Sequence, residues 1–383
     1  MAASFLRLEI DNLGIKAKVI EQSYKQTLIK DDCYVLYEDL KDQDLQGEEL
    51  QDKELQDTQE SPDFFDTGMD LVIQHLDLEE CSTAVILVPT SFISFRNIQF
   101  PFSSEKKVKQ VLPFELEALL PGINQTYISD FHMLDMSGET HFILSASMDE
   151  PLVEKYFSKL DTLGIKPLII APLGYACVAL FLKERKDIST FAFLHISDGD
   201  ITLVLVNDRK PCVVRTFCSA DISADGLAVS VKQTIIGYNQ RTGANLSFDI
   251  FVSADEDSQN AGPVYLALEK TLEYQAGLRT VEQGFQKALI QEKINSTALL
   301  LNLSPDKAVK YLFNFCKGKY GTSSFFKTYF SNIAASIVLF VCMLSFSLIS
   351  VGFDNSNLEQ KIAVIDKKAV SIFKATFPDE KKI

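Results

Sequence analysis

Hydrophobic and polar residues alternate in two runs near the N-terminus, at residues 5–10 and 15–20. Such alternation places every second side chain on one face and is typical of a half-buried β-strand. The residues between the runs, Asp11-Asn12-Leu13-Gly14, are of the kinds that form tight turns. The pattern therefore predicts a β-hairpin at the start of the chain.

Short apolar runs and helical patterns alternate along most of the chain before residue 325. The extended runs predict strands at residues 84–88, 92–100, 131–134, 140–147, 167–170, 191–196, 201–207, 213–217 and 248–253. The helical patterns predict helices at residues 66–76, 103–112, 114–120, 149–163, 175–183, 222–236 and 264–276. Mixed strands and helices of this kind predict an α/β body with some antiparallel strands. We expect two halves, residues 1–150 and 151–325.

Residues 38–66 interrupt this pattern. They hold twelve acidic residues against two lysines, and acid-Leu-Gln recurs every five residues around Leu45, Leu50 and Leu55. A period of five fits neither a helix nor a strand. We therefore expect a disordered, solvated acidic insertion within the first half.

A long uncharged run lies near the C-terminus, between Lys327 and Asp354. Its centre, residues 333–351, is uncharged and mostly apolar, and a helix of this length is about 28 Å long, close to the thickness of a bilayer core. This favours a transmembrane helix at residues 331–352 over a buried core helix. Four lysines precede it, at positions 310, 317, 319 and 327. The positive-inside rule then places the N-terminal body in the cytoplasm and residues 353–383 on the far side, as a short amphipathic helical tail.

Net charge and cysteine spacing narrow the function classes. The formal charge is −15, but the acidic segment supplies most of it, and the absence of a basic face argues against nucleic acid as a partner. The seven cysteines show no Cys-x-x-Cys spacing, as suits reduced thiols.

No residues are nominated for catalysis or metal binding. The four histidines, at positions 75, 132, 141 and 195, have no ligand partners at recognised spacings. Glu115 and Glu117 are two residues apart, so on a helix they point away from each other. No nucleophile-elbow, Walker A or zinc-protease motif occurs.

Two segments share one plan, residues 8–19 and residues 194–204: strand, turn with an acid and a glycine, strand. The pair resembles the phosphate loops of the actin-like ATPase fold. Within that superfamily, the block from Pro89 through Phe100-Pro101-Phe102 to Leu120-Pro121 resembles type II secretion system protein L (GspL) and the pilus protein PilM. Residues 314–320 resemble the element that closes this cytosolic region in the family. The resemblance implies a degenerate actin-like (RNase H-like) cytoplasmic body, one transmembrane helix and a short periplasmic helical tail.

The resemblance also implies a function. In the family, the body docks a secretion ATPase (GspE-like) at the bacterial inner membrane and joins it to the envelope complex. The partners implied are that ATPase, a GspM/PilN-like membrane protein, and a second copy in a homodimer. PilM lacks a membrane helix of its own, so the helix of this chain favours the protein L interpretation. The family's periplasmic domain would need more residues than follow Gly352.

The candidate phosphate-loop positions are Asp11, Gly14 and Lys16 in the first turn, and Asp198 and Gly199 in the second. The second departs from the family pattern, because a histidine, residue 195, stands where an acid is usual. Acids at residues 255–257 stand where glycines would lie against adenosine. We therefore expect a pseudo-ATPase without a cofactor, in which any ATP binding is weak. The alternatives are an active actin-like ATPase or nucleotide-binding PilM-like pilus protein, and a membrane-tethered signalling receptor.

Overall fold

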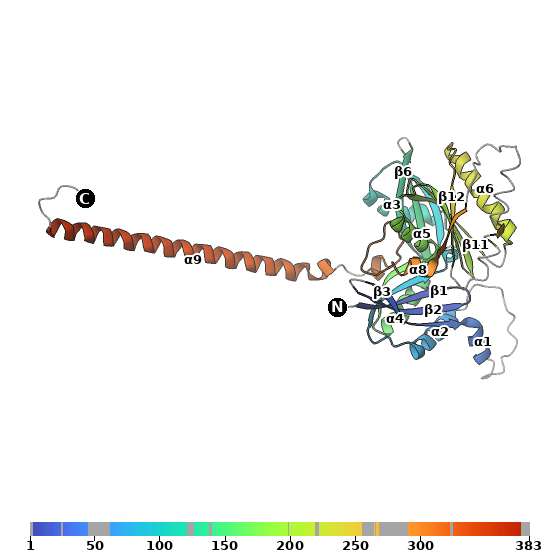
Figure 1. Ribbon diagram of the computed structural model, residues 1–383, viewed down its shortest axis with the longest axis horizontal. Coiled ribbons are helices and arrows are strands. Elements are labelled where there is room, and N and C mark those ends of the chain that lie inside the picture. Colours follow the sequence, from blue (N-terminus) through green and yellow to red (C-terminus); the bar gives the residue numbers. More distant parts are fainter. Residues whose placement is uncertain are drawn as a thin grey trace. The chain divides into compact units, whose positions relative to one another are not determined.

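The protein forms two compact units, Met1–Gly321 and Thr322–Ile383, each described by itself. The computed structural model describes residues 3–23, 26–44, 62–120, 126–137, 140–197, 199–218, 222–254, 264, 266–267, 290–321 and 325–376. The first unit contains three β-sheets and most of the helices (Figure 1). The second contains one long helix.

The first sheet is a meander extended by two parallel strands. Its five strands stand in the order β3 (Thr27–Leu36), β2 (Gly14–Gln22), β1 (Ala3–Ile10), β4 (Cys81–Val88) and β8 (Lys166–Pro172). β1, β2 and β3 pair antiparallel, whereas β4 pairs parallel with β1 and with β8. The predicted N-terminal hairpin is confirmed by the pairing of β1 with β2.

The second sheet repeats this order. Its strands are β11 (Lys210–Cys218), β10 (Asp200–Asn207), β9 (Phe191–Ile196), β12 (Asp249–Ala254) and β13 (Ile290–Asn295). Again three strands form an antiparallel meander and two more add in parallel. The body is therefore built from two sheets of one topology. The predicted division at residue 150 stays a prediction, and β8, which lies beyond that residue, completes the first sheet.

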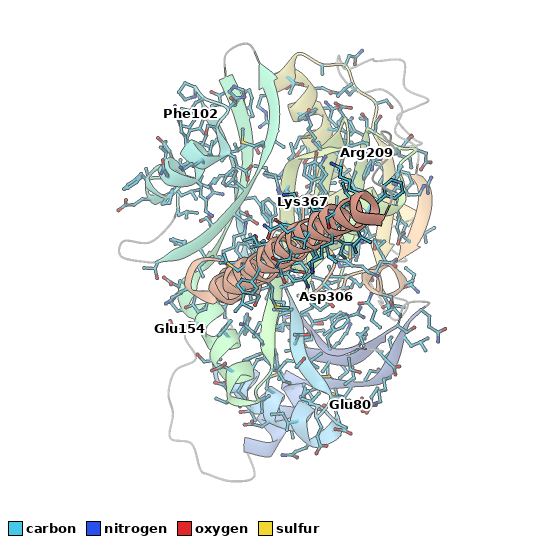
Figure 2. The ribbon with its side chains drawn as sticks, turned by 90° about the vertical axis from the view of Figure 1, so that its left-hand side faces the viewer. Glu80, Phe102, Glu154, Arg209, Asp306 and Lys367 are labelled. Carbon is cyan, nitrogen blue, oxygen red and sulfur yellow. The ribbon has the colours of Figure 1, made fainter. Side chains whose placement is uncertain are left out.

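A third, antiparallel sheet is inserted between β4 and β8 in the chain. It consists of β5 (Ser94–Phe100), β7 (Thr140–Asp149) and β6 (Tyr127–Ser137), in that order. Helix α3 (Glu105–Glu117) packs its apolar side on this sheet, and Phe102 lies 5.3 Å from Phe100 between ring centroids (Figure 2). Ser104 caps the helix by accepting a hydrogen bond from the amide of residue 107.

Helix α5 (Leu173–Glu184) lies between the two five-stranded sheets and contacts strands of both. Its residues 173–182 are all buried, which explains why this stretch is apolar on every side. Helix α2 (Pro62–His75) packs on the first sheet, where Gly68 lies against Ile15. Other helices among the described residues of the body are α4 (Glu150–Thr162), α6 (Ala224–Thr242) and the short α8 (Ser296–Leu300).

The predicted disordered insertion at residues 38–66 is wrong at both of its ends. Helix α1 (Tyr37–Asp44) occupies its start, and the first turn of α2 occupies its end. Leu40 and Phe65 are buried in the core, and their burial outweighs the acidic composition around them. Residues 45–61 lie outside the described residues, as do most residues of the helix predicted at 264–276.

The second unit is a single helix, α9 (Phe325–Thr376), of 52 residues. Among the described residues it is the one helix long and apolar enough to cross a membrane, by length and composition. The expected helical tail is present as far as Thr376, and it continues α9 without a break through Gly352; its place on the far side of a membrane stays a prediction. A lone glycine costs a helix only about 1 kcal/mol, and the next proline comes at residue 378.

Candidate functional site

The first candidate turn is held by its own acid. One carboxylate oxygen of Asp11, Oδ1, accepts hydrogen bonds from the amides of Leu13 and Gly14, both at 2.8 Å. The amide of Asp11 donates to the carbonyl of Gly14 at 3.0 Å, and the side chain is buried. This is the Asx-turn geometry in which an aspartate stabilises a hairpin turn.

The other two candidates in this turn contact strand β3. A side chain at Gly14 would place its Cβ 2.1 Å from the carbonyl oxygen of Val35, so the glycine is required by the close approach of β2 and β3. The ammonium of Lys16 lies 5.1 Å from the ring centroid of Tyr34, a cation–π distance. Packing within the first sheet thus explains why residue 14 is a glycine. The side chain of Lys16 is held by its contact with the ring of Tyr34.

The second candidate turn connects β9 to β10. Asp198 lies outside the described residues, and Gly199 is buried. The sequence analysis missed Asp200, which is buried and whose Oδ2 accepts a hydrogen bond from the amide of Ser91 at 2.9 Å. Ser197 donates its hydroxyl to the carbonyl of Asp200 at 2.8 Å. The acid of the second turn therefore reaches out of its own sheet, to a segment 109 residues earlier.

The fold brings the two turns together. The side-chain amide of Asn12 donates to the carbonyl of Gly199 at 3.4 Å, across 187 residues of sequence. A Cβ at Gly199 would lie 3.0 Å from that same amide nitrogen. The side chain of Asn12 therefore stands between the two turns.

The region beneath the turns is also densely packed. Thr90, in the short 3₁₀ helix η1 (Thr90–Phe92), accepts a hydrogen bond from the amide of Gly174 at 3.0 Å through Oγ1. A Cβ at Gly174 would meet Oγ1 of Thr202 at 2.3 Å and a ring carbon of His195 at 3.1 Å. Thr90, Thr202 and His195 are all buried. Close packing at this junction favours a structural role for these residues.

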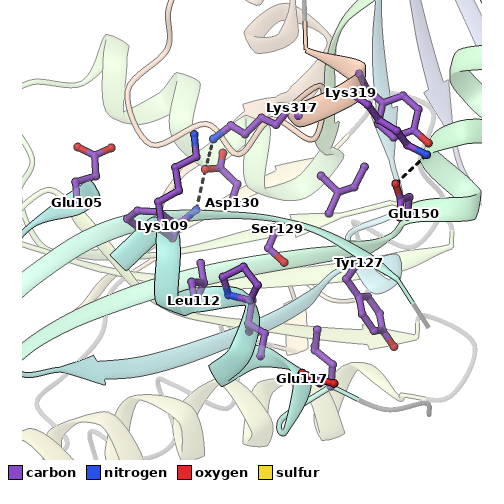
Figure 3. Close-up of a pocket in the computed structure, with 17 residues that line it drawn as sticks. Glu105, Lys109, Leu112, Glu117, Tyr127, Ser129, Asp130, Glu150, Lys317 and Lys319 are labelled. Carbon is purple, nitrogen blue, oxygen red and sulfur yellow. Dashed lines mark hydrogen bonds and ion pairs between the residues drawn. The ribbon is translucent and has the colours of Figure 1, made fainter. Parts of the chain in front are cut away.

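A groove lies in another part of the body, between α3, β6 and residues 317–320. Its volume is about 890 Å³ (Figure 3). The partly exposed apolar lining includes Leu120, Ile128 and Phe131, above the buried side chains of Leu112 and Leu116. Exposed Lys109 and Glu117 stand on the α3 side. An apolar floor with a charged rim is the composition of protein interfaces.

Ion pairs fix the wall of the groove opposite α3. Asp130, on β6, accepts a hydrogen bond from the amide of Asn314 at 3.1 Å and pairs with the ammonium of Lys317. Lys319 pairs with Glu150 at 3.0 Å (Figure 3). The hydrogen bond from Lys319 lowers the pKa of the Glu150 carboxyl. The pKa of Lys319 is raised by its hydrogen bonds with Tyr320 and Glu150. Residues 317–320, which precede α9, thus form part of a surface that ion pairs hold in place.

The same segment lies along β8, the edge strand of the first sheet. The side chain of Asn314 accepts from the amide of Ile170 at 3.1 Å and donates to the carbonyl of Leu168 at 2.9 Å, both on β8. Phe313 is fully buried, with its ring 4.3 Å from that of His132 between centroids. Burial lowers the pKa of His132 to about 4, although Asp130 acts in the opposite direction.

The histidines and acids considered as metal ligands or paired catalytic groups are not brought together in the described residues. Within the described ranges, no group of three or more histidine, cysteine or acidic side chains is placed to hold a metal ion. Glu117 lines the groove, whereas Glu115 stands on the same helix outside its lining. Asp255, Glu256 and Asp257, expected to oppose a nucleotide, lie outside the described residues.

Comparison with known proteins identifies the fold. No protein-family model and no curated protein matches the sequence. A chain of the PilM-PilN type IV pilus biogenesis complex matches with a TM-score of 0.53 and 15% identity, over 77% of this chain and 89% of that one. The body of this chain therefore shares its fold with that chain.

Two further solved structures have lower scores. The cytoplasmic domain of EpsL, an inner membrane component of the type II secretion system of Vibrio cholerae, matches with a TM-score of 0.45 and 10% identity, over 83% of this chain and 100% of that one. A Bacteroides thetaiotaomicron protein with an actin-like ATPase fold and unknown function gives 0.45 and 8%, over 79% and 96%.

Proposed function

We propose that this chain is an inner-membrane assembly platform of a type II secretion or type IV pilus-like system, whose body docks the cytoplasmic secretion ATPase to the envelope complex. One observation carries the proposal: a body with the fold of a chain from a pilus biogenesis complex is followed in this chain by a helix apolar enough to span a membrane. A GspM/PilN-like membrane protein and a second copy of the chain complete the proposed assembly.

The proposed topology has the body in the cytoplasm and the end of α9 in the periplasm. The lysines before the helix support this orientation, because cytoplasmic flanks of membrane helices are enriched in lysine and arginine. The protein should fractionate with the inner membrane, and protease added from outside should remove only the part after about residue 352. Recovery in a soluble fraction without detergent would contradict the topology.

The body is proposed to bind partners and to catalyse nothing. Asp11 is engaged in its own turn, and the side chain of Asn12 stands between the two turns. An active actin-like ATPase would need open space there for phosphate and magnesium. These contacts favour the platform over the ATPase alternative.

The groove between α3, β6 and residues 317–320 is proposed as the surface that docks the ATPase. Its apolar floor supplies buried area, and the exposed charges on α3 supply orientation and partner choice. The wall opposite α3 is held by ion pairs, so it needs little ordering on binding.

The docking test uses the full chain in nanodiscs and the purified cognate ATPase. Reversing both exposed groove charges, Lys109→Glu with Glu117→Lys, should weaken ATPase binding by on the order of tenfold. The matched control is Lys106→Glu with Glu115→Lys, on exposed positions of the same helix outside the groove lining. If both double variants bind the ATPase equally well, the groove is not the docking surface. No binding by the unaltered chain at low salt would defeat ATPase docking itself.

A further inference from the structure

The last part of α9 carries an apolar stripe with heptad spacing. Leu358, Ile362, Ile365, Ala369 and Ile372 follow one another at intervals of four, three, four and three residues. This average of 3.5 residues is the repeat of the a and d positions in a coiled coil. Leu358, Ile362 and Ile365 are each more than half exposed to solvent.

Between Leu358 and Ile372, the charges beside the stripe are sorted by sign. Acids, Glu359 and Asp366, occupy the e positions on one side, and lysines, Lys361 and Lys368, occupy the g positions on the other. At the two ends of the stripe, Asp354 stands at a g position and Phe373 at an e position. Within one helix, Lys361 and Asp366 are five residues apart, whereas side chains meet at spacings of three or four. Lys361 and Asp366 can therefore each form an ion pair with a side chain of a neighbouring helix.

The sign pattern selects the orientation of that neighbour. In a parallel pair of identical helices, a g residue faces the e residue of the next heptad in the partner, so Lys361 meets Asp366 of the second copy. In an antiparallel pair, e faces e and g faces g, which would bring acids onto acids and lysines onto lysines. Asn355 stands at an a position one step before Leu358, where a single asparagine fixes register and favours two strands.

This stripe is distinct from the membrane-spanning part of the helix. Residues 336–351 are exposed and carry no charge, whereas five charged side chains lie between residues 359 and 368. A helix of this kind extends into water, where an exposed apolar face requires a partner. A bilayer that covered the stripe would also have to cover those charges.

We propose that the part of α9 from residue 355 to residue 374 forms a parallel, two-stranded coiled coil with the same segment of a second copy. The inference rests on the proposed homodimer and assigns its interface to this stripe. Because both copies enter the membrane in one direction, their tails meet in parallel. The coiled coil thereby holds two cytoplasmic bodies as a pair.

Disulfide cross-linking in isolated membranes tests the interface. Single variants Leu358→Cys, Ile362→Cys and Ile365→Cys are compared with Gln360→Cys, Val364→Cys and Lys367→Cys off the stripe, all in a Cys342→Ala background. Cysteines at facing a or d positions come within disulfide distance. All three stripe variants should give covalent dimer on mild oxidation, at least fivefold more than the off-stripe variants. The yield from the background chain is subtracted, and only variants recovered in the membrane fraction are compared.

Each other outcome overturns the assignment. Cross-linking at one stripe position alone would indicate an antiparallel pair, and equal or absent cross-linking at all six positions would exclude the interface. A second series uses Ile365→Cys as reporter: Lys361→Glu or Asp366→Lys alone should lower the dimer yield, and both together should restore it. Failure to restore contradicts the paired charges. The ATPase-binding assay on the same variants keeps failure of this inference separate from failure of the platform.

Discussion

The two five-stranded sheets of the body have one strand order but use their hairpin turns differently. In the first turn, Asp11 binds the amides of its own turn. In the second, Asp200 binds the amide of Ser91, which belongs to the other half of the body. Both acids bind their own turn, since Oδ1 of Asp200 also accepts from the hydroxyl of Ser197 at 3.2 Å, but Asp200 in addition connects the halves. A duplicated fold can therefore keep its topology while the acids of its turns take structural roles.

The two halves also differ in what is inserted into them. Between β4 and β8, the first half carries the third sheet and α3, which form the groove together with residues 317–320. In the second half, residues 255–289 separate β12 from β13, and the structure describes only three of them. The proposed docking surface thus belongs to the first half.

The largest expected difference between the turns concerns their glycines. Gly14→Ala should lower the free energy of unfolding by roughly 3 kcal/mol or more, because the new Cβ would meet a backbone oxygen. Gly199→Ala should cost about 1 kcal/mol or less, because it would meet the side chain of Asn12, which can move. Denaturant unfolding of the full chain in detergent measures both.

The control for this comparison is Gly237→Ala, within α6. No atom lies within 4 Å of the added Cβ there, so alanine should stabilise the protein by about 0.5–1 kcal/mol. Equal losses at Gly14 and Gly199 would show that the turns are packed alike.

The insert of the first half should make stability depend on pH. The pKa of His132 is about 4 in the folded protein, against an ordinary value of 6.5. The unfolded chain therefore binds the proton more tightly, so the stability is full above about pH 6.5 and is lost as pH falls towards 4. The loss is on the order of 3 kcal/mol.

Replacing His132 by Phe should flatten this part of the pH profile. The measurement is the urea midpoint of the full chain at pH 7 and pH 5, compared between His132→Phe and the control His75→Phe at an exposed position of α2. A profile that flattens in the control, or that persists in His132→Phe, would contradict the assignment.

Removing the acid of each turn should increase hydrogen exchange in a different part of the body. Asp11→Ala and Asp200→Ala should each cost about 1–3 kcal/mol, because partly buried backbone amides lose their acceptors. Hydrogen exchange should rise around residues 13 and 14 in the first variant, and around residue 91 in the second. The same exchange pattern in both variants would erase the distinction between a local and a connecting acid.

How far the sequence predicts this molecule depends on the range of the contacts involved. The hairpins follow from alternation among neighbouring residues, and the apolar helix follows from its length. The bond from Ser91 to Asp200 spans 109 residues and leaves no local signal. Leu40 and Phe65 are buried among acids, so composition concealed helix α1 and the first turn of α2. The groove is formed by three segments that are distant in sequence. The sequence predicted features of these segments one by one but not that they come together.

The central claim is that the facing turns hold the two halves together and do not serve nucleotide chemistry. The most direct measurement is the turnover of ATP, with and without magnesium, by the full chain in nanodiscs and by its Asp11→Ala variant under the same conditions. The account predicts no magnesium-dependent turnover in either protein. Magnesium-dependent turnover by the unaltered chain that is lost in Asp11→Ala would contradict it and establish an actin-like ATPase.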